Sequence, residues 1–113
     1  MGRRVEETST RAERFHVEMP VRYRLPDSRE WYEALTENVS RTGVLIRGEC
    51  EFPPATLVDV LLEVPQLSRD DGPAEVVCQG EVVRKEGPRR SNLFPAVAVA
   101  IHNFRLRRKS LSN

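Results

Sequence analysis

A short polar string, Asn38-Val39-Ser40-Arg41-Thr42-Gly43, holds the residue types in this chain that are best suited to binding a ligand. Asn38 and Ser40 carry short hydrogen-bonding side chains that also bend the backbone. Gly43 permits a positive φ and a close approach of a ligand to the backbone. Between two strands, such a loop can form a concave site for an anion or for the edge of a base. The same residues also fit an ordinary hairpin loop, so the string alone leaves both interpretations open.

Alternating apolar residues predict the strands that position this loop. Every odd position from 15 to 25 is apolar, whereas the even positions are charged, histidine or proline, which predicts a strand with one buried face. Pro20 lacks an N–H and therefore places this strand at a sheet edge or a bulge. Further strands are expected at about 30–37, 43–46, 56–64, 74–84 and 96–101, separated by turns. Six such strands predict an all-β fold, a small antiparallel barrel or sandwich.

The last third of the chain carries two distinctive patterns. Residues 96–101 are apolar without interruption, which is typical of a short central strand buried on both faces. In the strand before them, Cys78 lies among alternating apolar positions and is predicted to be a small core residue. Residues 103–109 are predicted to form either one or two helical turns or a polar fray. Their basic side chains fit a solvated tail or a contact with an acidic partner.

The formal net charge is only +1, from 18 Lys and Arg against 17 Asp and Glu, but the charges are segregated. Residues 1–25 carry six Arg against four Glu, residues 26–102 carry eight basic against 13 acidic groups, and residues 103–113 carry four basic groups and no acid. This distribution is compatible with a local anionic ligand and disfavours the coating of a nucleic-acid polymer. With 113 residues, the chain has room for one domain.

The sequence shows no arrangement suited to catalysis or to metal binding. His16 and His102 fall in different expected strands without a carboxylate or serine arrangement, so we do not expect a catalytic pair. Cys50 and Cys78 lie far apart and form no CxxC pair, which argues against a zinc or redox motif. No apolar run approaches the roughly 20 residues of a membrane span, and the first 30 residues contain no segment resembling a signal peptide. We therefore expect a cytoplasmic protein that is not an enzyme.

In this context the string NVSRTG resembles the (D/N)xSxxG signature of PilZ domains, six-stranded β-barrel modules that bind the bacterial second messenger cyclic di-GMP. RFHVEMPVRYR is similar to the first barrel strand, GVLIRG to the strand after the signature, and AVAVAIHNF to the last strand. The resemblance implies a PilZ-like antiparallel barrel over residues 13–106, between a flexible charged leader of residues 1–12 and a basic tail of residues 107–113. It also implies cyclic di-GMP as the ligand, no further cofactor, and an effector protein as a partner.

The second PilZ signature, an RxxxR motif just before the first strand, is incomplete in this chain. In the family, its arginines hold the phosphates and guanine edges of the ligand. Counting back from Met19-Pro20-Val21, the second arginine falls on Arg14 and the first on Thr10, with Arg11 beside it. One signature cation is therefore missing. The cyclic di-GMP site that the resemblance implies consists of Arg11, Arg14, Asn38, Ser40 and Gly43.

Three functions are compatible with these observations. A receptor would bind cyclic di-GMP, order its leader and thereby switch a protein–protein interaction. Thr10 in the arginine position favours instead a degenerate adaptor that binds a protein partner without nucleotide. A small OB-like nucleic-acid binder is disfavoured by the acidic body of the chain. Trp31 and Tyr32 fit core or edge packing, or a stacking face for a base.

Overall fold

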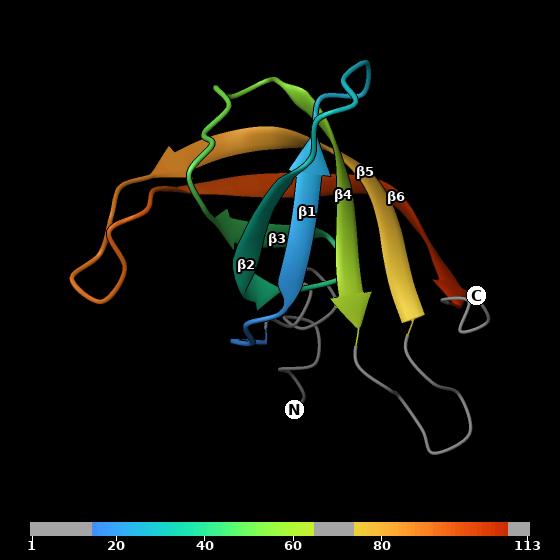
Figure 1. Cartoon of the computed structure of the whole chain (residues 1–113), viewed down its shortest axis with the longest axis horizontal. Helices are drawn as coiled ribbons and strands as arrows, with labels where there is room; N and C mark the ends of the chain where they lie inside the picture. The colour runs from blue at the N-terminus through green and yellow to red at the C-terminus, as the bar shows by residue number, and fades with distance from the viewer. Residues whose placement is uncertain (1–14, 65–73, 109–113) are drawn as a thin grey trace, which may run out of the picture.

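The computed structural model describes residues 15–64 and 74–108, which form a closed barrel of antiparallel strands (Figure 1). The strands follow the order β1-β2-β3-β6-β5-β4 around the barrel, and β4 pairs with β1 to close it. The predicted all-β barrel is thus confirmed. None of the described segments is a helix of the length and apolarity needed to cross a membrane. The strands are β1 (Pro20–Arg24), β2 (Tyr32–Val39), β3 (Gly43–Arg47), β4 (Leu57–Val64), β5 (Ala74–Glu86) and β6 (Ala96–Arg108).

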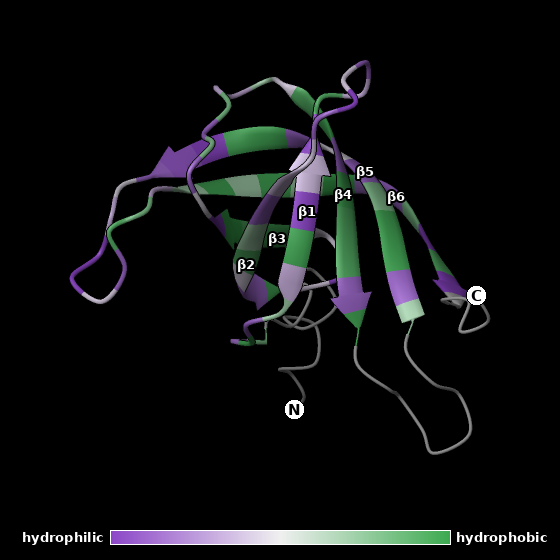
Figure 2. Ribbon diagram, in the orientation of Figure 1, coloured by the Kyte–Doolittle hydropathy of each residue, from purple (hydrophilic) through white to green (hydrophobic). Residues whose placement is uncertain are grey.

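Inward-facing side chains of the strands fill the barrel with a single main core. Side chains alternate between the two faces of each strand, and Figure 2 shows hydrophobic stretches along β4, β5 and β6. Cys78 is 1% exposed, which confirms its prediction as a core residue. Burial raises the pKa of its thiol to about 11, so the group stays protonated at neutral pH and packs as an apolar side chain. The largest fully buried side chains are Tyr23, Ile46, Val21, Val58, Val60, Val82, Val97, Val99, Thr36 and Cys78.

The strand expected over residues 15–25 is shorter in the structure. Only β1 forms a continuous ladder, with β2 on one side and β4 on the other, so it is not an edge strand. The prediction that Pro20 marks an edge or a bulge is therefore wrong. Pro20 is the first residue of β1 and pairs with Leu35 of β2, and at that position its missing N–H costs little.

Residues 15–19 precede β1 and are held against the second half of β2. Phe15 and Val39 exchange two backbone hydrogen bonds, of 2.9 and 3.0 Å. The hydroxyl of Thr36, which is 1% exposed, accepts from the N–H of Met19 at 2.9 Å and donates to the carbonyl of Val17 at 2.6 Å. These bonds fix the path by which the chain reaches the barrel.

β6 has 13 residues and is longer than the sequence predicted. Residues 96–100 lie between β3 and β5, and residues 96–99 are buried on both faces, as expected for a central strand. Residues 103–108 form neither a helical turn nor a fray, because they continue β6 in pairing with β5, which satisfies their backbone groups. Residues 109–113 lie outside the described part of the chain.

The seam at which β3 pairs with β6 depends on residues without large side chains. A Cβ atom added to Gly43 would lie 3.1 Å from the carbonyl oxygen of Val99. On the far side of β6, a Cβ atom added to Gly80 of β5 would lie only 2.4 Å from the carbonyl oxygen of Ala100. The backbones can therefore approach this closely because glycine occupies both positions.

We expect Gly80→Ala to destabilise the barrel by about 1–3 kcal/mol, because the added methyl group would force the backbone of β6 to move. Gly87→Ala is the matched control, since a Cβ atom there meets nothing within 4 Å. Urea denaturation monitored by the fluorescence of Trp31, the single tryptophan, measures both variants. Equal free energies of unfolding for Gly80→Ala and Gly87→Ala would contradict the close approach of β5 to β6 at Gly80.

Candidate functional site

A β-bulge turns the side chain of Asn38 to the outer face of the barrel. Thr36 pairs with Ile46 and faces the core, whereas the next paired residue of β2 is Asn38, opposite Leu45. Glu37 is the extra residue between them. In a regular strand, Asn38 would share the inward face of Thr36, because side chains two positions apart point to the same side. The bulge thus places a polar side chain of the NVSRTG string where a ligand can reach it.

Residues 40–42 connect β2 to β3, and contacts between Ser40 and Gly43 close this turn. The N–H of Ser40 donates to the carbonyl of Gly43 at 2.8 Å, and its hydroxyl oxygen accepts from the N–H groups of Thr42 and Gly43 at 3.3 and 3.2 Å. Gly43 belongs to the β3 ladder and does not adopt a positive φ. Glycine is needed here because the backbone of β6 passes close to it.

A second bulge, in β5, places Arg84 on the same outer face. Val82 pairs with Val99 in the core, and the next paired residue is Arg84, opposite Ala98, with Val83 as the extra residue. The sequence does not indicate a place for Arg84 at this site, because regular alternation from Val82 would point its side chain into the core. A charged residue at an expected core position was the one signal that could have indicated the bulge. Its guanidinium Nη2 lies 2.7 Å from the Glu86 carboxylate.

These elements surround a hollow of about 180 Å³ on the outer face, which we call the outer hollow. Asn38, Ser40 and Gly43 line one side of it and Arg84 the other, while Ala98 contributes a small apolar side chain. The side chain of Asn38 makes no hydrogen bond to another described residue, so its amide can bind a ligand. The structure therefore brings together three of the residues that the sequence singled out.

Arg11 and Arg14, the two remaining predicted site residues, lie outside the described part of the chain, as does Thr10. The residue after Arg14 is Phe15, which is bonded to Val39, directly before Ser40. The described chain thus begins beside the turn that borders the outer hollow.

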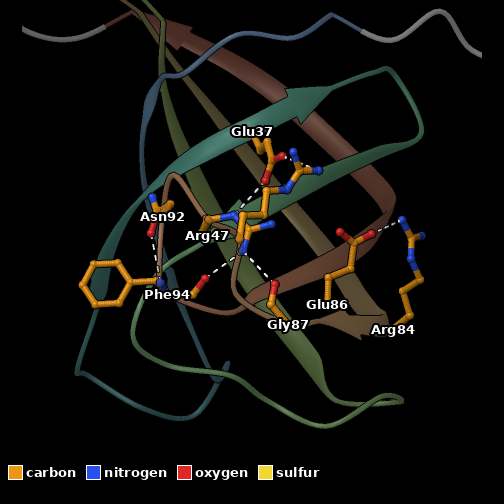
Figure 3. Close-up of polar contacts among 8 residues, drawn as sticks. Glu37, Arg47, Arg84, Glu86, Gly87, Asn92 and Phe94 are labelled. Carbon is orange, nitrogen blue, oxygen red and sulfur yellow. Dashed lines mark hydrogen bonds and ion pairs between the residues drawn. The ribbon is translucent and has the colours of Figure 1, made fainter.

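The extra residue of the first bulge, Glu37, forms ion pairs with two arginines, and Figure 3 shows its contact with Arg47. Its carboxylate oxygens lie 2.8 Å from Nε of Arg47 and 2.7 Å from Nη2 of Arg89. Arg47 is 5% exposed, and its Nη1 donates to the carbonyls of Gly87 and Phe94 at 3.0 and 2.7 Å. Arg47 therefore connects the bulged part of β2 to the hairpin between β5 and β6.

Trp31 and Tyr32 have packing roles at the end of β2 that lies away from the outer hollow. The ring of Tyr32 lies 6.1 Å from that of Tyr23 and 6.0 Å from that of Phe52, measured between centroids. The guanidinium of Arg24 lies 4.2 Å above the centre of the Trp31 ring. The packing interpretation of these two aromatics is thus confirmed.

The histidine and cysteine side chains have environments that the sequence indicated only in part. Pairing of β5 with β6 brings Nε2 of His102 to 3.6 Å from the Glu81 carboxylate, a neighbour that the sequence did not indicate. Desolvation raises the pKa of Cys50 above its ordinary value, which disfavours the nucleophilic thiolate. In residues 15–64 and 74–108, no group of three or more His, Cys, Asp or Glu side chains is arranged to hold a metal ion.

Comparison with known families decides the classification of this barrel. The sequence model of the PilZ domain family matches residues 8–111. The chain belongs to the PilZ domain family. PilZ domains are in general receptor or adaptor modules for cyclic di-GMP. No curated protein sequence matches this PilZ chain.

Among solved structures, the PilZ barrel is similar to the Bacillus subtilis inhibitor of motility, MotI/DgrA, with a TM-score of 0.70. The two chains are 12% identical, and the match covers 93% of this chain and 45% of the other. The likeness at this identity concerns the fold. The PilZ chain thus spans less than half the length of that protein.

We expect Arg47→Met to destabilise the barrel by about 2–4 kcal/mol, because it leaves two hairpin carbonyls without a donor and removes a buried partner of Glu37. Arg89→Met removes the other partner of the same carboxylate, but the Arg89 side chain is 56% exposed. Its loss is expected to cost less than about 1 kcal/mol. Thermal and urea unfolding of the two variants provide the comparison, and similar losses would contradict the structural role assigned to Arg47.

Proposed function

We propose that this PilZ protein is a non-catalytic receptor that binds cyclic di-GMP and switches a protein–protein interaction. The observation that carries the proposal is the convergence of Asn38, Ser40 and Gly43 on the outer hollow. The amide of Asn38 is available to a base edge or a phosphate oxygen, and the small side chain of Ala98 leaves room for a flat ring. The general role of PilZ domains supports the choice of ligand.

The size of the outer hollow supports a role for the N-terminal arginines. Its volume, about 180 Å³, is below the roughly 300–1,000 Å³ of ordinary ligand pockets. It can therefore take one part of a cyclic dinucleotide, and the rest must be held from outside the barrel. Arg14 directly precedes Phe15, which is anchored at the edge of the site, and Arg11 lies three positions earlier. On this proposal, both guanidinium groups bind phosphate or guanine edges in a bidentate manner.

Arg84 supplies on this proposal the cation that the RxxxR motif lacks at Thr10. It reaches the outer hollow from β5, opposite the side on which Asn38 and Ser40 lie. Its present partner, Glu86, is only an exposed surface contact that a phosphate can replace at small cost. A ligand held between the leader and the barrel would bring residues 1–14 onto the outer face and change the surface that an effector protein meets.

Isothermal titration of the full chain with cyclic di-GMP tests the receptor function. We expect binding below about 100 μM, and a roughly 5- to 150-fold loss of affinity in Arg14→Ala, because one bidentate contact is removed. Asn38→Ala should also weaken binding without loss of stability, because its amide has no partner among the described residues. Arg90→Ala, an exposed arginine on the β5–β6 hairpin, serves as the control and should bind normally.

A wild-type chain that gives neither heat nor a thermal shift with about 100 μM cyclic di-GMP would contradict the receptor function. Thr10 would then favour the alternative, an adaptor that binds its protein partner without nucleotide. For an adaptor, partner binding is unaffected by Arg14→Ala and by added cyclic di-GMP.

We expect Arg84→Ala to weaken cyclic di-GMP binding by roughly 3- to 30-fold, because a charge-assisted contact to phosphate is lost. Lys85→Ala removes the neighbouring cation, which pairs with Glu51 and does not line the outer hollow. The same titration compares the two variants. Equal affinities would show that Arg84 does not contact the nucleotide, even if the wild-type chain binds it.

A further inference from the structure

The second half of β6 has an open edge. Residues 96–100 pair with β3 on one side and β5 on the other, whereas Ile101 and residues 103–108 pair with β5 alone, and His102 is the extra residue of a bulge between them. The last contact across the seam is the hydrogen bond from the N–H of Ile101 to the carbonyl of Thr42, at 2.9 Å. Beyond it, β6 is the outermost strand beside β5 (Figure 1). In the described part of the chain no strand covers this edge, so its outward N–H and C=O groups can pair with an added strand.

An apolar cavity of about 460 Å³ adjoins this edge. It lies in the gap between the two sides of the barrel, with Phe15 and Val39 on one side and Cys78, Ile101 and Phe104 on the other. Phe15 is 57% exposed and Phe104 is 53% exposed, so both rings are accessible to solvent. Exposed rings around an apolar hollow mark an interaction site.

Along residues 104–107 of the open edge, apolar side chains alternate with basic ones. Phe104 lies opposite Cys78, so Phe104 and Leu106 share the face of the cavity. Arg105 and Arg107 point to the opposite face. Arg107 already contacts Glu75 at 3.0 Å, whereas Arg105 is exposed and has no ion pair with another described residue. A strand laid against this edge would therefore meet an apolar cavity on one face and a basic surface on the other.

We propose that an extended segment of a partner protein, with acidic residues alternating with apolar ones, adds to β6 along residues 103–108. Backbone hydrogen bonds to the open edge provide affinity, as in other cases of strand addition. The apolar side chains of the added strand enter the cavity, and its acidic side chains face Arg105 and Arg107. The alternation along β6 thus specifies both the conformation and the charge of the partner.

Charge and composition argue against two other occupants of this edge. Residues 1–14 carry four Arg against three Glu, and their only large apolar residues are Met1 and Val5, too few to fill the cavity. A second copy that paired through the same edge would bring Arg105 and Arg107 close to their own counterparts, and like charges on neighbouring strands are destabilising. An acidic strand from a different protein avoids both difficulties.

Fluorescence anisotropy with a labelled peptide, Thr-Val-Glu-Leu-Glu-Val-Glu-Thr, tests the proposal on the full chain. We expect this peptide to bind, and the same peptide with lysine in place of glutamate to bind at least about tenfold more weakly. Arg105→Glu should weaken the acidic peptide by roughly 3- to 10-fold, because it replaces attraction by repulsion. Arg90→Glu makes the same charge change on the β5–β6 hairpin and should leave binding unchanged. N-methylation of the peptide amides that face β6 should abolish it.

Amide hydrogen exchange then distinguishes the occupants. We expect the edge amides of residues 102–108 to exchange faster than those of residues 96–100 in the free chain, and the acidic peptide to slow them. Strong protection of the edge in the free chain at every concentration would show that the chain's own residues cover it, and protection lost on dilution would show a second copy. Either result would overturn the proposal. Equal affinity for the acidic and basic peptides, or no binding of either at about 1 mM, would do the same.

Discussion

The pairing of β3 with β6 is the contact on which the rest of this structure depends. It joins residues 43–47 to residues 96–100, two segments far apart in the sequence, and so connects the strands β1–β2–β3 to the strands β4–β5–β6. The two strands can meet because Gly43 and Gly80 leave the space that a methyl group would fill beside β6. Where the pairing exists, it brings Ala98 next to the NVSRTG string and forms the outer hollow. Where the pairing ends, after Ile101, the barrel opens into the apolar cavity and leaves the edge of β6 uncovered.

Two of the bulges in this barrel determine which polar side chains surround the outer hollow. Each inserts one residue, and because the side-chain period of a strand is two, each reverses the direction of the residues that follow. Asn38 and Arg84 are outside the barrel for this reason, on opposite sides of the same hollow. The bulge in β2 also positions Glu37, whose carboxylate pairs with Arg47 and with Arg89 of the β5–β6 hairpin. The same bulge in β2 therefore turns Asn38 toward the outer hollow and places the carboxylate that holds the β5–β6 hairpin against β2.

The sequence predicted the strands wherever one face of a strand is buried. Val58 and Val60 of β4, for example, alternate with more exposed residues as their spacing requires. It did not predict the bulges, because an inserted residue leaves composition and hydrophobicity almost unchanged. Arg47 ends an apolar run, yet it is buried by partners 10, 40 and 47 positions away that only the fold brings together. Of the candidate site, the NVSRTG string lies at the connection between two strands, as predicted. Its binding role and the placement of Arg11 and Arg14 stay predictions.

The extent of β6 shows how a tertiary contact decides a local conformation. Within residues 103–108, apolar and basic side chains alternate only over residues 104–107, a span too short to separate a strand from a helical turn. Pairing with β5 decides in favour of the strand, because it provides partners for backbone groups that an isolated turn would leave to water. The same extension creates the open edge, since β3 begins at Gly43, opposite Ala100, and has no residues beside the part of β6 that follows the seam.

Ser40 is the point at which the two proposed binding surfaces meet. It lines the outer hollow together with Asn38, and it lines the apolar cavity together with Phe15. Two residues further on, the carbonyl of Thr42 accepts the last hydrogen bond of the seam from Ile101. A nucleotide that moved or fixed this turn would alter the gap in which a partner strand lies and would thereby change the affinity for that strand. Thermodynamic linkage then requires the bound strand to change the affinity for the nucleotide by the same factor. A nucleotide that bound without changing the turn or the seam would not change the affinity of the β6 edge for a partner strand. The turn from Ser40 to Gly43 is therefore the element through which nucleotide binding and partner binding can be coupled in so small a barrel.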